Sequence, residues 1–293
     1  MEPGGARAGG APAHILSRVL ETEQLLFTSA LVCLGRFRSE PANPAFAGGA
    51  PCSGHTVAFP RRAVWIQHEG GRPFVADPAT VTLYNRGQIY HRSAIDPRGD
   101  ACAWMAFPST VLAAASAALG RPAQDTPDTP FDAAAVRSNG ALHIAQRRLF
   151  AAAMRGDAAD IEERALLLLD LVLRQAGAPA RRQPVPVEAI EEARRLINLE
   201  GASPHSLTAL AHACGLSPYR LCREFKRATG MTISAYRTGI RMFAALETLP
   251  RAADLSALAL DAGFCSHSHF SAAFKRVFDT TPSKVRAMLT AGA

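Results

Sequence analysis

Two stretches near the end of the chain decide the fold: LTALAHACGLSPYRLCREFKRATGMT at 207–232 and LSALALDAGFCSHSHFSAAFKRVFDTTP at 255–282. Both begin with Leu-x-x-Leu-Ala, continue to a glycine and a short polar stretch, and end in Phe-Lys-Arg. The second copy carries one extra residue. A pattern this detailed that occurs twice indicates an internal repeat of one structural unit.

Each copy predicts a short helix, a turn and a second helix. Apolar residues at i, i+3 and i+4 give the first helix one apolar side. Gly215 and Gly263 end that helix where the backbone needs a positive φ. Ser217 and Ser266 are the expected N-caps of the second helices, and Pro218 suits a first helical position. The repeat therefore predicts two helix-turn-helix motifs, over 207–229 and 255–278.

The second helix of each motif is predicted to bury an aromatic stripe and to present polar groups on its other side. Leu221 and Phe225 form the stripe in the first motif, and Phe270 and Phe274 form it in the second. Helices that present basic and polar groups suit the major groove of DNA. One such pattern also fits an ordinary helical hairpin, but two copies favour DNA. The outward-facing candidates are Tyr219, Arg220, Cys222, Arg223, Lys226, Arg227, His267, Ser268, His269, Ser271, Lys275 and Arg276.

The region 188–290 resembles the AraC/XylS family of bacterial transcription regulators. The motifs that carry the resemblance are LAHACGLSPYRLCREFKRATGMTISAYRTGIRM and LALDAGFCSHSHFSAAFKRVFDTTPSKVR. The resemblance implies a seven-helix all-α DNA-binding domain over 188–293, with a long linking helix at about 233–246. It further implies that the two recognition helices enter successive major-groove segments. The implied partners are promoter DNA, RNA polymerase and a second copy of the chain, while activation and repression both stay open.

Family positions also distribute roles among the candidates. Tyr219, Cys222 and Arg223 fall where the family reads bases, and Arg223 is the expected guanine reader because a guanidinium binds O6 and N7 together. In the second motif the corresponding positions are His267, Ser268, His269 and Ser271. Phosphate contacts are expected from Lys226, Arg227, Lys275 and Arg276. Ala272 stands where many members have Arg, so base reading is expected to depend more on the first motif.

The first half of the chain predicts strands followed by helices, so the whole chain is expected to be α+β. Strand-like pieces separated by Pro, Gly and Asn fill 25–107 and resemble the cupin-like β-barrel of the family's sensory half. A helical segment follows at 108–176, with helices expected at 109–119, 131–154 and 157–176. Its Leu-rich run 165–173 is expected to pack internally, to form a dimer seam, or to do both on different faces. A flexible tail and lead-in at 1–24 and a linker at 177–187 complete the division.

Composition agrees with a protein that meets a polyanion. The 293 residues carry a formal net charge of +7, and from residue 188 onward 13 Lys and Arg face 9 Asp and Glu. No stretch of about 18 apolar residues is present, so no membrane span is expected. The six cysteines are scattered singly, which is typical of reduced thiols and favours the cytoplasm. The N-terminus lacks the pattern of an export signal.

Two further sets of residues are candidates for the N-terminal half. Trp65, Tyr84, Tyr90 and Trp104 are predicted either to line an effector pocket or to form plain barrel core. Cys52 and His55, with His68, His91 and Cys102, could form a metal or thiol sensor, or the site of a cupin-type enzyme with a DNA-binding tail. The pattern of two nearby His and a Glu typical of such enzymes does not occur. We therefore expect no metal, no cofactor and no catalytic residue.

Overall fold

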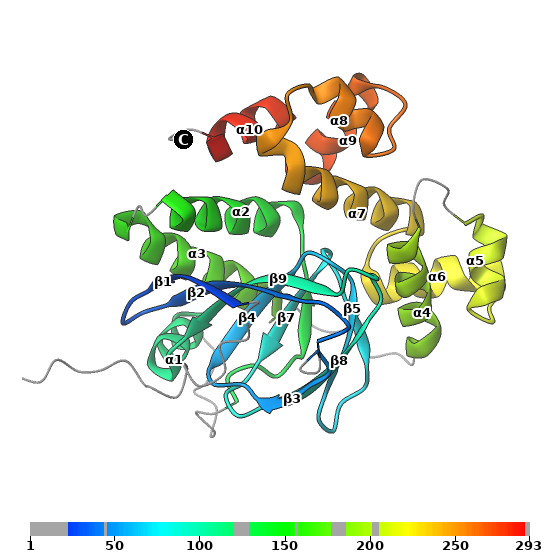
Figure 1. Cartoon of the computed structure of the whole chain (residues 1–293). Coiled ribbons are helices and arrows are strands. Elements are labelled where there is room, and N and C mark those ends of the chain that lie inside the picture. Colours follow the sequence, from blue (N-terminus) through cyan, green and yellow to red (C-terminus); the bar gives the residue numbers. More distant parts are fainter. Residues whose placement is uncertain are drawn as a thin grey trace, which may run out of the picture.

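The computed structural model describes residues 23–43, 46–119, 129–155, 158–176, 186–200 and 205–290. A part built of strands and helices is followed by a part built of helices alone (Figure 1). Most of the expected tail and linker lies outside the described residues. No helix in the described ranges is long and apolar enough to cross a membrane.

The strands pair antiparallel into two sheets. A six-stranded sheet has the order β1-β2-β9-β4-β7-β10, and a four-stranded sheet has the order β3-β8-β5-β6. In chain order the strands are β1 (Glu23–Thr28), β2 (Cys33–Ser39), β3 (Gly48–Pro51), β4 (His55–Pro60), β5 (Val64–His68), β6 (Phe74–Ala76), β7 (Thr80–Tyr84), β8 (Ile89–Ala94), β9 (Asp100–Phe107) and β10 (Ala135–Arg137). The strand pairings of the described residues thus give two separate sheets and not one closed ring of strands.

The six-stranded sheet is buried on both faces. Along β9, Cys102 and Trp104 pack in a cluster with residues of the four-stranded sheet. Ala103 and Met105 pack on the other face, in the cluster that also holds the helices. Because successive strand residues point to opposite faces, this alternation builds two hydrophobic cores on one sheet.

Three helices cover the outer face of that sheet: α1 (Ser109–Ala118), α2 (Gly140–Arg155) and α3 (Ala158–Ala176). The helix expected over 131–154 was wrong in its first part, because 135–137 form β10, in which Val136 pairs with Val81 of β7. The side chain of Asn139 then accepts a hydrogen bond from Leu142 N at 2.9 Å, and α2 begins there. A sheet partner more than fifty residues away therefore overrode the local helical pattern.

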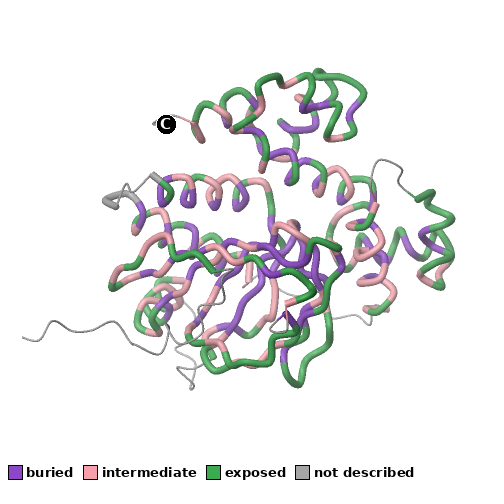
Figure 2. Tube along the Cα trace, in the orientation of Figure 1, coloured by how far each residue is buried: buried purple, intermediate pink, exposed green. Residues whose placement is uncertain are grey.

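The C-terminal part is formed by helices around one core. They are α4 (Val187–Leu199), α5 (Leu207–Ala213), α6 (Pro218–Thr229), α7 (Ile233–Thr248), the 3-10 turn η2 (Leu249–Arg251), α8 (Leu255–Asp261), α9 (His267–Phe278) and α10 (Pro282–Thr290). Figure 2 shows the buried residues concentrated on the inward sides of these helices and in the sheets. The predicted helix-turn-helix pairs are α5–α6 and α8–α9, and the predicted linking helix is α7.

Candidate DNA-reading surface

Local sequence explains the turn of the first motif. Gly215 has φ +64°, a conformation that glycine adopts without strain. Ser217 caps α6 by accepting a hydrogen bond from Arg220 N at 3.3 Å, and Pro218 occupies the first helical turn. Leu221 and Phe225 are fully buried. The predicted cap and stripe of the first motif are confirmed.

The outward side of α6 is open to solvent. Tyr219 is 76% exposed, and Arg220, Cys222, Arg223 and Lys226 are exposed as well. The guanidinium carbon of Arg223 lies 5.9 Å from the centre of the Tyr219 ring. Arg227 is only partly exposed. These six predicted candidates therefore lie on one helix, five of them accessible to a partner.

The sequence analysis missed Glu224, which is buried between two of these arginines. Its Oε1 accepts hydrogen bonds from Arg223 Nε and Nη2 at 3.2 and 3.0 Å. Its Oε2 lies 2.5 Å from Arg227 Nη2, and its side chain is 4% exposed. Charge-assisted hydrogen bonds of this kind fix a guanidinium in one orientation. Glu224 thus holds Arg223 and Arg227 in place on the recognition helix. The spacing of Glu224 three residues before Arg227 could have indicated this ion pair from the sequence.

The second motif repeats this construction. Gly263 has φ +76°, and Ser266 caps α9 by accepting from His269 N at 3.1 Å. Phe270 and Phe274 are fully buried, as predicted. Of the predicted readers and phosphate contacts, Ser271 is partly exposed and the others are exposed, namely His267, Ser268, His269, Lys275 and Arg276.

Two of the α9 histidines already have partners within the domain. His267 Nε2 lies 3.3 Å from Ser271 Oγ. His269 Nδ1 lies 3.2 Å from Cys265 Sγ, and its ring meets the edge of Phe264 at a centroid distance of 5.2 Å. These contacts orient both rings at the start of α9. The surface of α9 is therefore polar and mostly neutral, in contrast to the arginine-rich surface of α6.

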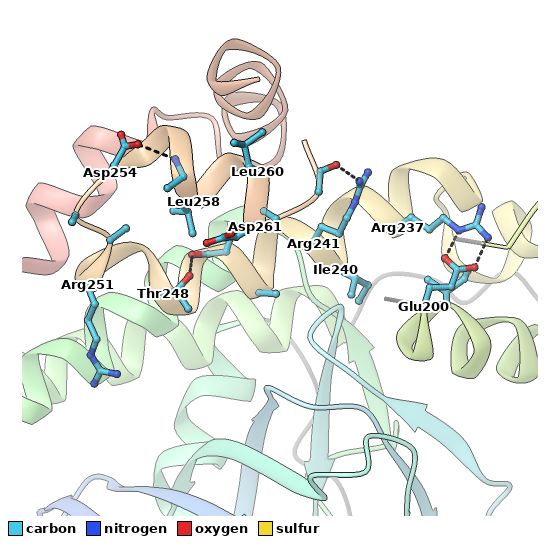
Figure 3. Close-up of a pocket in the computed structure, with 18 residues that line it drawn as sticks. Glu200, Arg237, Ile240, Arg241, Thr248, Arg251, Asp254, Leu258, Leu260 and Asp261 are labelled. Carbon is cyan, nitrogen blue, oxygen red and sulfur yellow. Dashed lines mark hydrogen bonds and ion pairs between the residues drawn. The ribbon is translucent and has the colours of Figure 1, made fainter. Parts of the chain in front are cut away.

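Helix α7 joins the two motifs and lines a groove between them (Figure 3). The cavity has a volume of about 880 Å³ and runs from the end of α4 along α7 to α8. At one end, Arg237 Nε donates to Glu200 Oε2 at 2.7 Å, which ties α7 to α4. Near the other, Arg241 Nη1 donates to Gly263 O at 3.0 Å. Helix α7 is thus fastened to the end of α4 on one side and to the turn of the second motif on the other.

A buried polar network fastens α4 and α7 to the sheet part. Asp77, between β6 and β7, is fully buried and accepts hydrogen bonds from Tyr236 Oη and from Asn198 Nδ2, the latter at 2.9 Å. Arg194 of α4 lies 3.3 Å from Asp77 and donates to Thr80 Oγ1 at 2.6 Å. Burial raises the pKa of Tyr236 well above its ordinary value, so the phenol keeps its proton and donates.

Helix α2 holds the second motif and the linking helix. The ring of His143 stacks on Phe243 of α7 at a centroid distance of 4.1 Å. Gly140 packs so closely on α9 that a Cβ there would lie 1.7 Å from Val277 O. Glu247 of α7 accepts hydrogen bonds from Arg61 and Arg147, both at 2.8 Å. The sheet part therefore contacts α4, the linking helix α7 and α9 of the second motif.

The four predicted effector-pocket residues lie in two places. Tyr84, Tyr90 and Trp104 belong to the core between the sheets, where the two tyrosine rings lie 4.7 Å apart. Trp65 packs in a separate small cluster with Val75. None of the four lines either the groove along α7 or the smaller cavity beside Thr80 and Arg194.

The residues of the metal or thiol hypothesis have structural contacts. His55 Nε2 lies 3.0 Å from Ser109 Oγ, and its Nδ1 accepts from Arg86 N at 3.1 Å. Burial raises the pKa of the Cys52 thiol to about 12. Within the described ranges, no three His, Cys, Asp or Glu side chains come together as a metal-binding group.

Comparison with known proteins shows what the region of the two motifs is similar to. A family model described as a helix-turn-helix domain matches residues 210–288. The chain is 33% identical over 84 residues to the regulatory protein SoxS of Salmonella typhimurium. That match covers 28% of this chain and 78% of SoxS. It is also 34% identical over 119 residues to the transcriptional regulator GlxA of Rhizobium meliloti. That match covers 38% of this chain and about a third, 35%, of GlxA.

Two solved structures were also matched. An AraC-type regulator from Chromobacterium violaceum is 28% identical, with a TM-score of 0.33, over 36% of this chain and 95% of that one. ToxT of Vibrio cholerae is 12% identical, with a TM-score of 0.37, over 94% of this chain and 100% of that one.

The paired motifs, the matched helix-turn-helix family model and the similarity to SoxS define a helix-turn-helix DNA-binding transcription regulator. The identity to SoxS, which extends over most of that protein, goes further: the chain belongs to the AraC/XylS family. The resemblance inferred from the sequence is confirmed.

Proposed function

We propose that this regulator reads two successive major-groove segments with α6 and α9, while its sheet part controls how the two helices are presented. The observation that carries the proposal is the pair of capped, solvent-facing helices fastened to one helix, α7. With 16 residues, α7 is about 24 Å long at 1.5 Å per residue. That length suits motifs that must reach major-groove segments about 34 Å apart on one face of DNA.

Arg223 is the proposed main base reader. Its side chain is 61% exposed, and Glu224 orients its fork without burying it. A guanidinium held in this way suits bidentate binding to guanine O6 and N7. Tyr219 and Cys222 flank it, and Tyr219 also offers a ring to the groove.

The second motif is proposed to add a weaker contribution. His267, Ser268, His269 and Ser271 offer hydrogen-bonding groups, but Ala272 offers none. Lys275 and Arg276, with Lys226 of the first motif, supply charge for phosphates. Arg227 is proposed to reach a phosphate while it stays paired with Glu224.

Titration of a selected DNA site in a mobility-shift assay tests these roles. Arg223→Ala is expected to lower specific affinity by roughly 1–3 kcal/mol and to relax preference at one base pair. Lys275→Ala is expected to weaken all sequences alike and to reduce the salt slope by about one unit. Arg98→Ala, which replaces an exposed arginine outside the proposed DNA-reading surface, is the matched control. Unchanged affinity and base preference in Arg223→Ala would remove Arg223 from the reading surface.

The sheet part is proposed to act as a cupin-like regulatory domain that responds to an effector or to a dimer contact. Its contacts with α4, α7 and α9 give it a physical means to alter the spacing of the motifs. Helix α3 is the proposed dimer seam, since Leu166, Leu167 and Leu171 stay exposed while Leu168 and Leu169 are buried. Sedimentation equilibrium of Leu167→Glu tests the seam: a monomer is expected, and an unchanged dimer contradicts it. RNA polymerase is the proposed further partner on promoter DNA.

A further inference from the structure

Arginines gather where the sheet part meets the end of the linking helix. Arg147 of α2 and Arg61, which follows β4, both bind the carboxylate of Glu247, with side chains 11% and 19% exposed. Arg36 of β2 faces the same side of the sheet as Leu34, toward the helices, because strand residues two apart share a face. Figure 3 shows Arg251 pointing from the groove toward α2. Electrostatic interactions link Arg36 to Arg147, Glu247 and Arg251.

Positive charge exceeds negative charge at this junction. Among the described residues, Glu247 is the one carboxylate that pairs with these arginines, and both hydrogen bonds go to its Oε2. The pKa of Arg61 is lowered to about 10, chiefly by burial and also by the neighbouring Arg147 and Arg36, against the opposite effect of Glu247. The pKa of Arg36 is also lowered, first by burial and then by the charge of neighbouring arginines, Arg147 above all.

Several donors of these arginines are buried without a partner. They are Nε of Arg36, Nε and Nη2 of Arg61, and Nε of Arg147. More than nine in ten buried polar groups in folded proteins have a partner, and an unpaired charged donor is the most unfavourable exception. Four such donors on three neighbouring arginines therefore indicate a ligand that completes the cluster.

We propose that Arg36, Arg61 and Arg147 bind the carboxylate or phosphate group of a small molecule. Arginine forks match oxyanions of both kinds through paired hydrogen bonds. The site lies on the outer, helix-covered side of the six-stranded sheet, apart from the core between the two sheets. It therefore differs in place from a pocket formed by Tyr84, Tyr90 and Trp104.

The site is linked to α7 through Glu247. A bound oxyanion takes the donors of Arg61 and Arg147 that Glu247 does not use, and its negative charge repels the Glu247 carboxylate. Occupancy therefore weakens the hold of the sheet part on α7. By linkage, a ligand that favours one arrangement shifts the protein toward it. Only this consequence for DNA rests on the proposed control by the sheet part, because anion binding is measured without DNA.

Titration of the full chain with sodium phosphate, and separately with sodium acetate, tests the site. Sodium chloride keeps the ionic strength constant, and the melting temperature and calorimetric heat are followed. We expect saturable binding of one anion per chain, and the anion that saturates identifies the preferred head group. Arg36→Gln is expected to weaken binding about tenfold or more, which is the scale of a lost charge-assisted hydrogen bond, and to leave the Glu247 pairs intact.

Glu247→Gln is expected to act in the opposite direction and to tighten anion binding, because it removes the carboxylate that repels the anion. Arg98→Gln is the matched control, since Arg98 is 70% exposed and pairs with Asp96 elsewhere. The site is overturned if neither anion differs from chloride, or if Arg36→Gln binds as tightly as the wild type. The opposite signs expected for Arg36→Gln and Glu247→Gln distinguish the site from general loss of stability. Failure of DNA reading by α6 and α9 would leave these binding results unaffected.

Discussion

The phenol of Tyr236 on the linking helix donates a hydrogen bond to the carboxylate of Asp77 in the sheet part, 159 positions earlier in the chain. Asp77 is fully buried and also lies 3.3 Å from Arg194. One carboxylate thus joins α4, α7 and the turn before β7. This places a fixed connection between the part that carries the reading helices and the part that carries the sheets.

Tyr236→Phe is expected to lower the free energy of unfolding by roughly 1–3 kcal/mol, because Asp77 loses one of its buried donors. Asp77→Asn is expected to cost roughly 2–3 kcal/mol, because Arg194 loses one of its two carboxylate partners and keeps only Glu191. Urea unfolding measures both. Asp170→Asn, which removes an exposed ion pair with Arg174, serves as the control and should change stability by less than about 1 kcal/mol.

Gly140→Ala is expected to separate the start of α2 from the end of α9. The added Cβ would lie 1.7 Å from Val277 O and 3.1 Å from Phe278 Cα, both backbone atoms. Backbone shifts forced in this way lower the free energy of unfolding by about 1–3 kcal/mol. The matched control is Gly54→Ala, whose Cβ meets nothing closer than 3.9 Å. Equal melting temperatures for the two variants would show that this contact does not hold the second motif.

Glu224→Gln tests whether Glu224 orients Arg223, the proposed base reader, and Arg227, a proposed phosphate contact. Loss of the carboxylate frees Arg223 and Arg227 to move independently and adds one net positive charge at the helix surface. We expect tighter binding to random-sequence DNA, a salt slope steeper by up to about one unit, and a smaller preference for the selected site. Glu188→Gln, an 82% exposed glutamate in α4, is the charge-matched control. An unchanged ratio of specific to random affinity contradicts the role of Glu224.

His143 predicts a pH dependence of stability. Its pKa is lowered from an ordinary value of 6.5 to about 3, chiefly by burial and also by the charges of Arg147 and Arg61. The unfolded chain therefore binds a proton between these values that the folded chain does not. Stability is highest above pH 6.5 and falls as the pH drops toward 3, by up to about 1.4 kcal/mol per pH unit from this group.

His143→Phe keeps a ring against Phe243 and removes this titration. The difference in unfolding free energy between the wild type and His143→Phe should therefore shift in favour of the variant as the pH falls from 6.5. Because acid groups elsewhere titrate alike in both proteins, the difference isolates His143. A difference that stays constant with pH would mean that His143 titrates normally in the folded chain.

The helix-turn-helix units could be predicted because their determinants are local. Ser217 and Ser266 cap helices within three residues, and Gly215 and Gly263 set the turns by their own backbone freedom. The start of α2 could not be predicted this way, because β10 forms only through pairing with β7.

The contacts between the two parts also could not be predicted from the sequence, because they join residues far apart in the chain. Arg61 and Glu247 are 186 positions apart, and Asp77 has no pattern around it that names Tyr236 as its partner. Glu224 differs from both, since its arginine partners are neighbours in sequence. Its burial was the missing fact, because a glutamate beside Phe225 reads as a surface residue when periodicity alone is used.

The central claim is that α6 and α9 read two adjacent major-groove segments. Hydroxyl-radical footprinting of the full chain on its selected DNA site measures this directly. The account predicts two protected patches on one face of the duplex, about 10 base pairs apart. Arg223→Ala should weaken one patch, and His267→Ala should weaken the other. A single protected patch, unaltered by the substitution in α9, would contradict the account.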